Sequence, residues 1–169
     1  MKRIITVLLI TLLAFSCAPK KKKSNVAYYG YDTSSNTVDI PFKVQSGVKW
    51  VSVKINGMST DMIFDTGCSG VLISPVEVIQ LYKQGLISND DYIGKTYSMI
   101  ADGSITEGDL VNIKSIELTD GKSSVICYNV KAEVSNNMEA PVLLGNAVFD
   151  KVASYTFDND AHVIRFKLY

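Results

Sequence analysis

An aspartate that ends an apolar segment is the strongest candidate for chemistry in this sequence. Residues 62–64 are apolar, Asp65-Thr66-Gly67 follows, and a second apolar segment begins at residue 71. A carboxylate at a strand end, aimed into a cleft, can activate water for hydrolysis. The small Gly67 allows a second backbone to come close, and the Thr66 hydroxyl can anchor the turn. An ordinary β-turn is the alternative, since Asp and Gly both favour turns.

A second element follows at a distance. Residues 141–145 form an apolar run that includes Leu143 and Leu144 and closes on Gly145, 80 positions after Asp65. A buried strand that ends in glycine is its simplest interpretation. A short helical turn is predicted directly after it, over residues 146–150.

Short strands and turns make up most of the remaining chain. Runs rich in Val, Ile, Thr, Tyr and Phe alternate with turn pairs such as Asn56-Gly57 and Asp102-Gly103. The first pair fits a two-residue hairpin turn between strands at 50–55 and 60–64. A second hairpin is expected about residues 102–103, and further strands over 125–134 and 162–168. This spacing predicts an all-β barrel or sandwich.

One longer helix is predicted between these strands. Residues 74–77 read Ser-Pro-Val-Glu, which combines a capping box with proline at the first helical position. Val78, Leu81 and Tyr82 then share one face at helical spacing. Gly85 is a suitable stop.

Taken together, these features resemble the retropepsin-like aspartic proteases, particularly their bacterial members. The resemblance spans about residues 38–168. It implies a closed β-barrel with a flap hairpin and one short helix, one lobe per chain. Leu143-Leu144-Gly145 matches the hydrophobic-hydrophobic-glycine element of the family, and Ala101-Asp102-Gly103 falls at the tip of the flap.

The resemblance also assigns roles around the aspartate. Asp65 becomes the catalytic carboxylate, Thr66 braces two active-site loops across a dimer interface, and Gly67 lets those loops approach. Residues 101–103 become flap residues that touch substrate. Cys68 departs from the family pattern, which has Ala or Ser there, and the flap tip lacks the glycine-rich run of viral members.

A single Asp-Thr-Gly implies two chains in an aspartic protease. Two carboxylates must hold one water, and at short range they share a proton. Residues 38–169 are too few for a two-lobed chain, so the second Asp65 has to come from another copy across a two-fold axis. The expected enzyme is a homodimeric aspartic endopeptidase that takes an extended peptide or protein substrate and needs no metal or cofactor. The alternative is a non-catalytic peptide- or protein-binding module of the same fold.

The amino terminus has the pattern of a signal that targets a protein to the cell envelope. Residues 1–16 combine an early Lys-Arg pair with a twelve-residue apolar run, as a signal peptide does. The segment ends at Cys17 in a context that resembles a bacterial lipobox, which predicts a lipidated, membrane-anchored and extracytoplasmic protein. A plain secretory signal is the alternative. Residues 17–37, with four consecutive lysines, are expected to form a basic, flexible tether.

Composition and charge argue against nucleic-acid-binding and zinc-binding proteins. Residues 24–169 carry 11 Lys and Arg against 17 Asp and Glu, a formal net charge of −6. This acidic body argues against nucleic acid as a partner. One histidine and three widely spaced cysteines exclude the common zinc sites. Cys68 and Cys127 either pair as a disulfide or stay reduced, and His162 is expected as an exposed turn residue.

Overall fold

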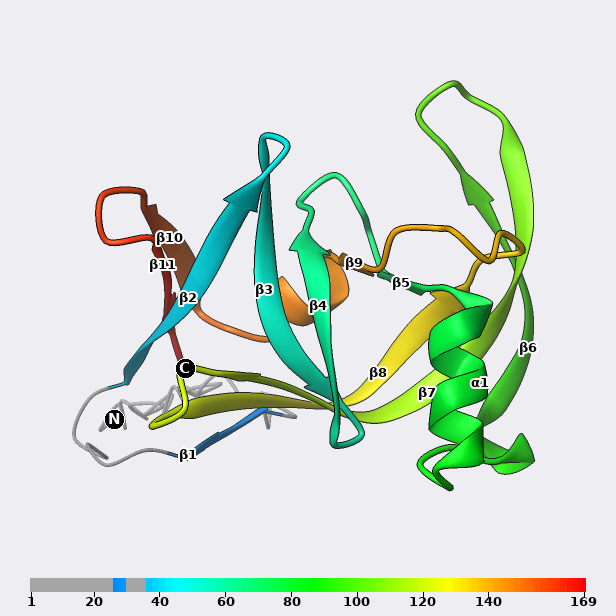
Figure 1. The fold of residues 1–169 in the computed structure, drawn as a ribbon, viewed down its shortest axis with the longest axis horizontal. Coiled ribbons are helices and arrows are strands. Elements are labelled where there is room, and N and C mark those ends of the chain that lie inside the picture. The colour runs from blue at the N-terminus through cyan, green and yellow to red at the C-terminus, as the bar shows by residue number, and fades with distance from the viewer. Residues whose placement is uncertain (1–25, 30–35) are drawn as a thin grey trace, which may run out of the picture.

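A computed structural model describes residues 26–29 and 36–169 of the chain, and strands dominate them (Figure 1). The strands are β1 (Val26–Tyr29), β2 (Thr37–Gln45), β3 (Val48–Ile55), β4 (Met58–Phe64), β5 (Val71–Ile73), β6 (Tyr92–Met99), β7 (Ile105–Thr119), β8 (Ser124–Val134), β9 (Leu143–Leu144), β10 (Ser154–Asp158) and β11 (Val163–Lys167). The helices are α1 (Pro75–Lys83), α2 (Asn146–Phe149) and the single 3₁₀ turn η1 (Asn89–Asp91). The predicted signal segment 1–16 and Cys17 lie outside the described residues. Within the expected tether, β1 pairs with β8.

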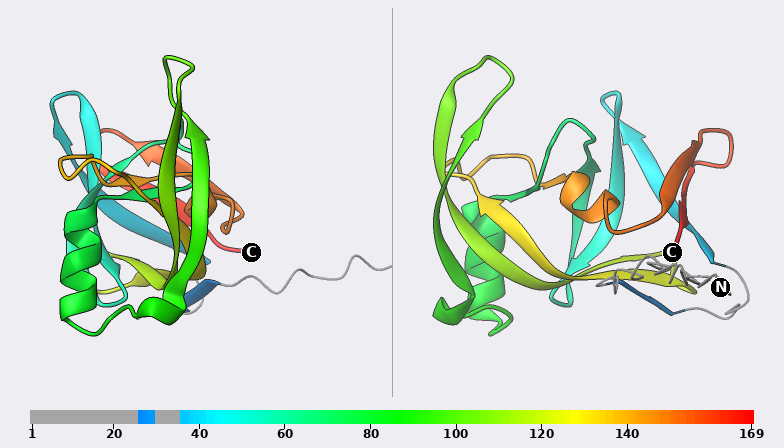
Figure 2. Two further views of the ribbon diagram at one scale, coloured as in Figure 1. Left: turned by 90° about the vertical axis from the view of Figure 1, so that its right-hand side faces the viewer. Right: turned by 180° about the vertical axis from the view of Figure 1, so that it is seen from behind.

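The strands join into one sheet that closes on itself. Their order is β10-β11-β2-β3-β4-β9-β5-β8-β7-β6, and a further pairing of β3 with β7 closes a ring. The all-β prediction is therefore confirmed, although the ring is less regular than a simple barrel. β6 and β10 end the order, and β6 pairs with β7 in a long hairpin that rises clear of the body (Figure 2).

Alternation along β3 shows how the sequence fills the core. Val51, Val53 and Ile55 are buried, while Ser52 between them is exposed. The hairpin turn after this strand is the predicted one, because Asn56 and Gly57 both have positive φ, 48° and 93°. Those values are typical of a type I′ turn, whose twist matches that of the flanking strands.

Helix α1 packs against the sheet through Leu81, which belongs to the hydrophobic core. Its predicted capping box is present: the Ser74 side chain accepts from Val76 N–H, and Glu77 accepts from the Ser74 N–H at 3.0 Å. Gly85, at φ 69°, ends the helix as expected. Leu81 is fully buried, but Tyr82 is 57% exposed, so the predicted apolar face is narrower than its spacing indicates.

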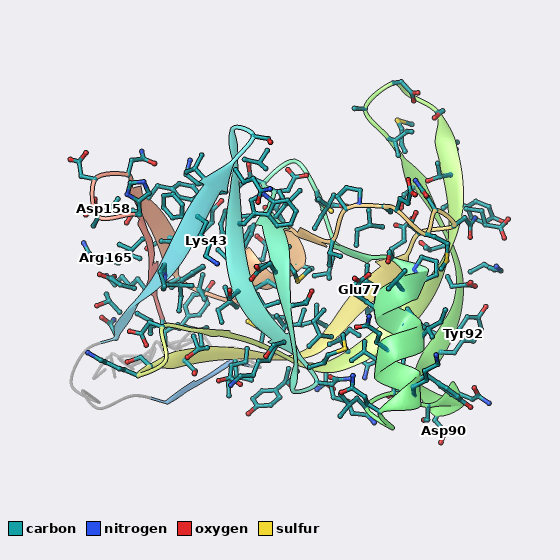
Figure 3. The ribbon with its side chains drawn as sticks, in the orientation of Figure 1. Lys43, Glu77, Asp90, Tyr92, Asp158 and Arg165 are labelled. Atoms are coloured by element: carbon teal, nitrogen blue, oxygen red, sulfur yellow. The ribbon has the colours of Figure 1, made fainter. Side chains whose placement is uncertain are left out.

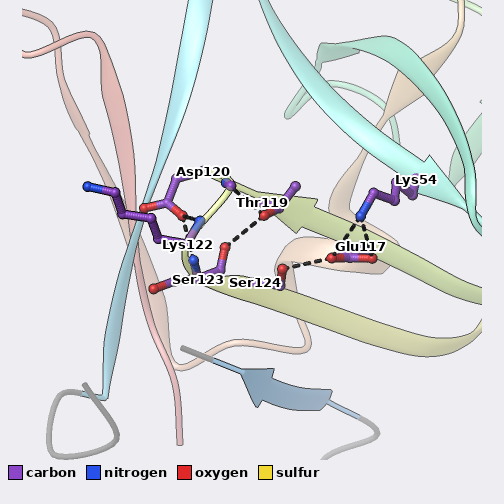
Figure 4. A network of polar contacts seen from close by, with 8 residues as sticks. Lys54, Glu117, Thr119, Asp120, Lys122, Ser123 and Ser124 are labelled. Atoms are coloured by element: carbon purple, nitrogen blue, oxygen red, sulfur yellow. Dashed lines mark hydrogen bonds and ion pairs between the residues drawn. The ribbon is translucent and has the colours of Figure 1, made fainter. Parts of the chain in front are cut away.

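The end of the β7–β8 hairpin away from the flap is held by polar contacts (Figure 4). Asp120 Oδ1 accepts from the backbone N–H groups of Lys122 and Ser123, at 2.7 and 2.5 Å. Glu117 accepts from the Ser124 hydroxyl at 2.7 Å and pairs with Lys54 at 3.4 Å. These contacts fix the register between β7 and β8 at the end of β7 that lies away from the β6–β7 hairpin.

A buried carboxylate fixes the base of the flap hairpin. Asp91 ends η1 immediately before β6, between Asp90 and Tyr92, both labelled in Figure 3. It accepts from the Ser88 N–H at 2.9 Å and lies 3.3 Å from Lys114. Burial raises the pKa of Asp91, but the Ser88 hydrogen bond and the Lys114 ammonium outweigh burial and hold the pKa below its ordinary value.

We expect Asp91→Asn to lower the free energy of unfolding by about 1 kcal/mol at neutral pH, since a capping carboxylate and its ion pair are lost. The pKa of Asp91 is lower in the folded chain, so this stabilisation is fully present at neutral pH, begins to fall at about pH 4 and is lost as the pH falls through the lower pKa of the folded chain. Urea unfolding of both proteins from pH 3 to 7 measures it. A difference that stays constant over this range contradicts the assignment.

Candidate active site

The backbone of Asp65 is held by a strand inserted between its own strand and the next. β9 lies parallel to β4 and antiparallel to β5. Ile63 N–H donates to the Val142 carbonyl at 2.9 Å, and Asp65 N–H donates to the Leu144 carbonyl at 3.0 Å. Leu144 is fully buried and Leu143 partly so. The two elements noticed in the sequence are therefore neighbours in space.

Gly145 lets the loop after Asp65 close over this strand. A Cβ atom at Gly145 would lie 2.3 Å from the Gly70 carbonyl oxygen and 2.4 Å from that of Cys68. Both distances are far below van der Waals contact, so only glycine fits here. The first N–H groups of α2 then meet the same loop: Asn146 N–H donates to Cys68 at 2.9 Å, and Ala147 N–H to Ser69 at 3.1 Å.

The Asn146 side chain completes this support, and sequence reasoning gave it no role beyond starting a helical turn. Its Nδ2 donates to the Thr66 carbonyl oxygen at 3.0 Å. The bond ties the middle of Asp65-Thr66-Gly67 to α2 across 80 residues of sequence. In the sequence, the one feature that points to this contact is the position of Asn146 directly after Leu143-Leu144-Gly145.

We expect Asn146→Ala to destabilise the fold by about 1 kcal/mol, the net value of one lost hydrogen bond. Because the Thr66 carbonyl then has no tether, the hydrolytic activity expected of Asp65 should fall by more than the loss of folded protein explains. Urea unfolding and peptide hydrolysis on the same samples separate the two effects. Activity that simply tracks the folded fraction would contradict a role for Asn146 in placing the loop.

The Asp65 carboxylate is only partly engaged. Its Oδ1 accepts from Gly67 N–H at 2.8 Å, and a Cβ atom at Gly67 would approach that oxygen to 3.1 Å. Among the described residues, Oδ2 has no hydrogen-bond donor. The side chain is partly exposed, and the neighbouring Thr66 and Gly67 are exposed. A pinned backbone with an available oxygen is what a water-activating carboxylate requires.

Cys68, three residues after Asp65, carries a partly buried thiol. Its Sγ lies 3.6 Å from the Gly70 carbonyl oxygen. Burial raises the pKa of Cys68, and the negative charges of Asp65 and Glu133 raise it further, so the thiol stays neutral. Cys127 is buried in β8, and burial raises its pKa to about 11. Both cysteines are free, which settles their pairing in favour of two separate thiols.

The predicted flap is the β6–β7 hairpin. Residues 101–103 lie exposed at its tip, where Gly103 N–H donates to the Ile100 carbonyl and Gly103 has a φ of 86°. Asp102 Oδ1 accepts from Ser104 N–H at 2.8 Å, which lowers the pKa of Asp102. Figure 1 shows this tip and the loop after β4 rising on the same side of the sheet, with the tip standing away from the loop.

Other candidate groups lie apart from this site. His162 is exposed beside the β10–β11 turn, with its ring 5.6 Å from that of Phe42. Within residues 26–29 and 36–169, no cluster of His, Cys, Asp and Glu has the arrangement of a metal site. In the same ranges, no helix has the length and apolar content needed to cross a membrane.

The sequence of the site matches a protease family. Residues 51–151 match the family model described as "gag-polyprotein putative aspartyl protease". This chain belongs to that family of retropepsin-like aspartyl proteases. The matched range contains both Asp65-Thr66-Gly67 and Leu143-Leu144-Gly145. No curated protein matches the chain in sequence.

The fold agrees with the family. The structure is similar to the crystal structure of a retropepsin-like aspartic protease from Rickettsia conorii, with a TM-score of 0.53 and 13% identity. The match covers 85% of this chain and 93% of the Rickettsia chain. At such low identity the likeness concerns the fold, and it confirms the retropepsin-like architecture expected of a member of this family.

Proposed function

We propose that this protein is an aspartic endopeptidase whose active form is a homodimer. The observation that supports this most strongly is the Asp65 loop. Its backbone is pinned by β9 and α2, while its carboxylate keeps one oxygen free of donors within the described residues. Membership of an aspartyl protease family supports peptide hydrolysis as the chemistry.

The proposed mechanism uses one Asp65 from each chain. Two carboxylates at short range cannot both ionise, so they share a proton and titrate as a unit. The ionised one takes a proton from water, and the protonated one donates a hydrogen bond to the scissile carbonyl. The resulting hydroxide adds to that carbon, and the carboxyl group that took the proton from water gives it to the amide nitrogen as the carbon–nitrogen bond breaks.

The surface around Asp65 suits a partner chain. Thr66 and Gly67 are exposed, and the Thr66 hydroxyl has no hydrogen-bond partner in the described part of the chain. A two-fold axis beside them would bring both carboxylates together and let each Thr66 hydroxyl reach the opposite loop. An extended substrate would then lie between the two carboxylates and the flap tips at residues 101–103.

We also propose that the enzyme works outside the cytoplasm on a membrane anchor. Residues 1–16 would be removed, and Cys17 would carry lipid. Tethering raises the local concentration of chains, which favours a weak dimer. Labelling with a radioactive fatty acid that is lost in Cys17→Ser would support this anchor, and unchanged labelling would refute it.

Peptide hydrolysis at increasing protein concentration tests the function. The purified full chain is incubated with a diverse peptide mixture at acidic to neutral pH, and mass spectrometry reads the cuts. We expect activity per chain to rise with protein concentration and to level off where sedimentation shows that the chains have become dimers. Peptide binding without cleavage by a dimer would instead favour the non-catalytic binding module.

A further inference from the structure

Glu133 lies on a strand beside the one that follows the Asp65 loop, and neither the sequence pattern nor the proposed mechanism uses it. It belongs to β8, where it pairs with Leu72 of β5 on one side and Leu110 of β7 on the other. β5 is the strand that follows the Asp65 loop. The negative charge of Glu133 also acts on the Cys68 thiol, as that of Asp65 does. Both carboxylates therefore lie near enough to act on the same thiol.

The flap reaches Glu133 from the other direction. Ser98 of β6 donates its hydroxyl hydrogen bond to Glu133 Oε2. The hairpin can bend this far because Gly108 has no side chain: a Cβ atom there would lie 2.8 Å from the Val134 carbonyl and 3.0 Å from Glu133 Oε1. Glu133 thus connects the base of the flap with the strands that carry the Asp65 loop.

Side-chain alternation identifies which face of the flap meets Glu133. Ser98 is opposite Thr106 in the hairpin, while Tyr97 is opposite Glu107. Successive residues of a strand point to opposite faces. Ser98 therefore lies on the face turned toward β8, and Glu107 lies on the outer face, where it pairs with Lys95 at 3.4 Å.

Within the part of the chain that the structure describes, the charge of Glu133 has no partner of opposite sign. Among the described residues, no Lys, Arg or His lies within ion-pair distance of it, whereas Glu117, Asp91 and Asp39 each pair with a cation. Glu133 is also partly buried. A carboxylate that is desolvated without a counter-ion raises the free energy of the empty site, and a cation brought by a ligand relieves it.

We propose that Glu133 is a specificity-determining residue that selects a lysine or arginine side chain of the substrate beside the scissile bond. The inference rests on the proposed peptidase function. Ser98 acts as a positioning residue, because its hydroxyl holds one carboxylate oxygen and leaves the other for the substrate cation. The acidic body of the protein adds a general attraction for basic peptides.

Cleavage of matched peptides by the full chain tests this. For each position near one cleaved bond, two peptides are compared that are identical except for Lys or Gln at that position. The variant Glu133→Gln keeps the shape and can still accept from Ser98, and Glu107→Gln is the matched control on the outer face. We expect wild type and the control to prefer Lys at one position. In Glu133→Gln, kcat/KM for that Lys peptide should fall about 10-fold or more, mainly through KM, with the Gln peptide unaffected.

A Lys preference that survives in Glu133→Gln would overturn the proposal, as would a wild type that cleaves both peptides equally. Fluorescence polarisation with the same two peptides gives a readout that needs no catalysis. If no protein cleaves, the peptidase function fails. Tighter binding of the Lys peptide that is lost in Glu133→Gln would still support Glu133 as the selecting residue, and equal binding of both peptides would refute it.

Discussion

Replacing Asp65 by asparagine is expected to abolish peptide cleavage while leaving the fold intact. The amide oxygen of the new side chain can still accept from Gly67 N–H, which now meets Asp65 Oδ1 at 2.8 Å. An amide cannot take a proton from water at any working pH. Since a positioned acid–base group contributes about 100- to 10,000-fold, we expect a loss of at least about 1,000-fold in kcat with little change in melting temperature.

Asp61→Asn is the matched control for this variant. Asp61 lies four residues earlier, on the strand β4 that ends just before Asp65; it is exposed and accepts from the Ser52 hydroxyl at 2.5 Å. It lies outside the loop that β9 and α2 support, so its replacement should leave hydrolysis unchanged. Cleavage that survives in Asp65→Asn, or that falls equally in both variants, would show that Asp65 does not carry the chemistry.

Among Gly→Ala substitutions at the described glycines, Gly145→Ala is expected to destabilise the fold most. The new Cβ would lie 2.3 and 2.4 Å from two backbone carbonyl oxygens of the Asp65 loop. Neither oxygen can rotate away as a side chain would. The loop must move, and with it the bonds from α2 to Cys68 and Ser69. We expect a loss of about 3 kcal/mol or more in the free energy of unfolding, at the upper end for overpacking.

Gly70→Ala provides the comparison within the same loop. A Cβ atom at Gly70 meets nothing within 4 Å, and its φ lies outside the left-handed region. Urea unfolding should therefore give a change within about 0.5 kcal/mol, as for ordinary surface substitutions. Equal destabilisation by both substitutions would mean that the tight packing at Gly145 does not support the loop.

Local features of the fold were predictable because their causes are local. The turn at Asn56-Gly57 follows from two residues that tolerate positive φ, and the start of α1 follows from Ser74 and Glu77. Alternation of apolar and polar residues along β3 matches which of its side chains are buried, which is again a local cause. The aspartate and the glycine of the candidate site stand out in the sequence because each ends an apolar run.

The remaining features depend on contacts between distant segments. Only two residues of β9 pair with β4 and β5, which is too short a stretch to show alternation. The closure of the ring through β3 and β7 leaves no local pattern either. Asn146 and Glu133 gain their roles from partners at Thr66 and Ser98, and a single polar residue beside an apolar run does not reveal such partners.

The shared catalytic pair is tested most directly by mixing two kinds of chain. Wild-type chains at fixed concentration are combined with a threefold excess of Asp65→Asn chains under conditions where dimers form, and peptide hydrolysis is measured. If each active dimer needs an Asp65 from each of its two chains, only about a quarter of the wild-type chains pair with another wild-type chain. Activity then falls to about a quarter of that of the same wild-type chains alone. Activity that stays proportional to the wild-type chains, whatever the excess, would contradict the shared pair.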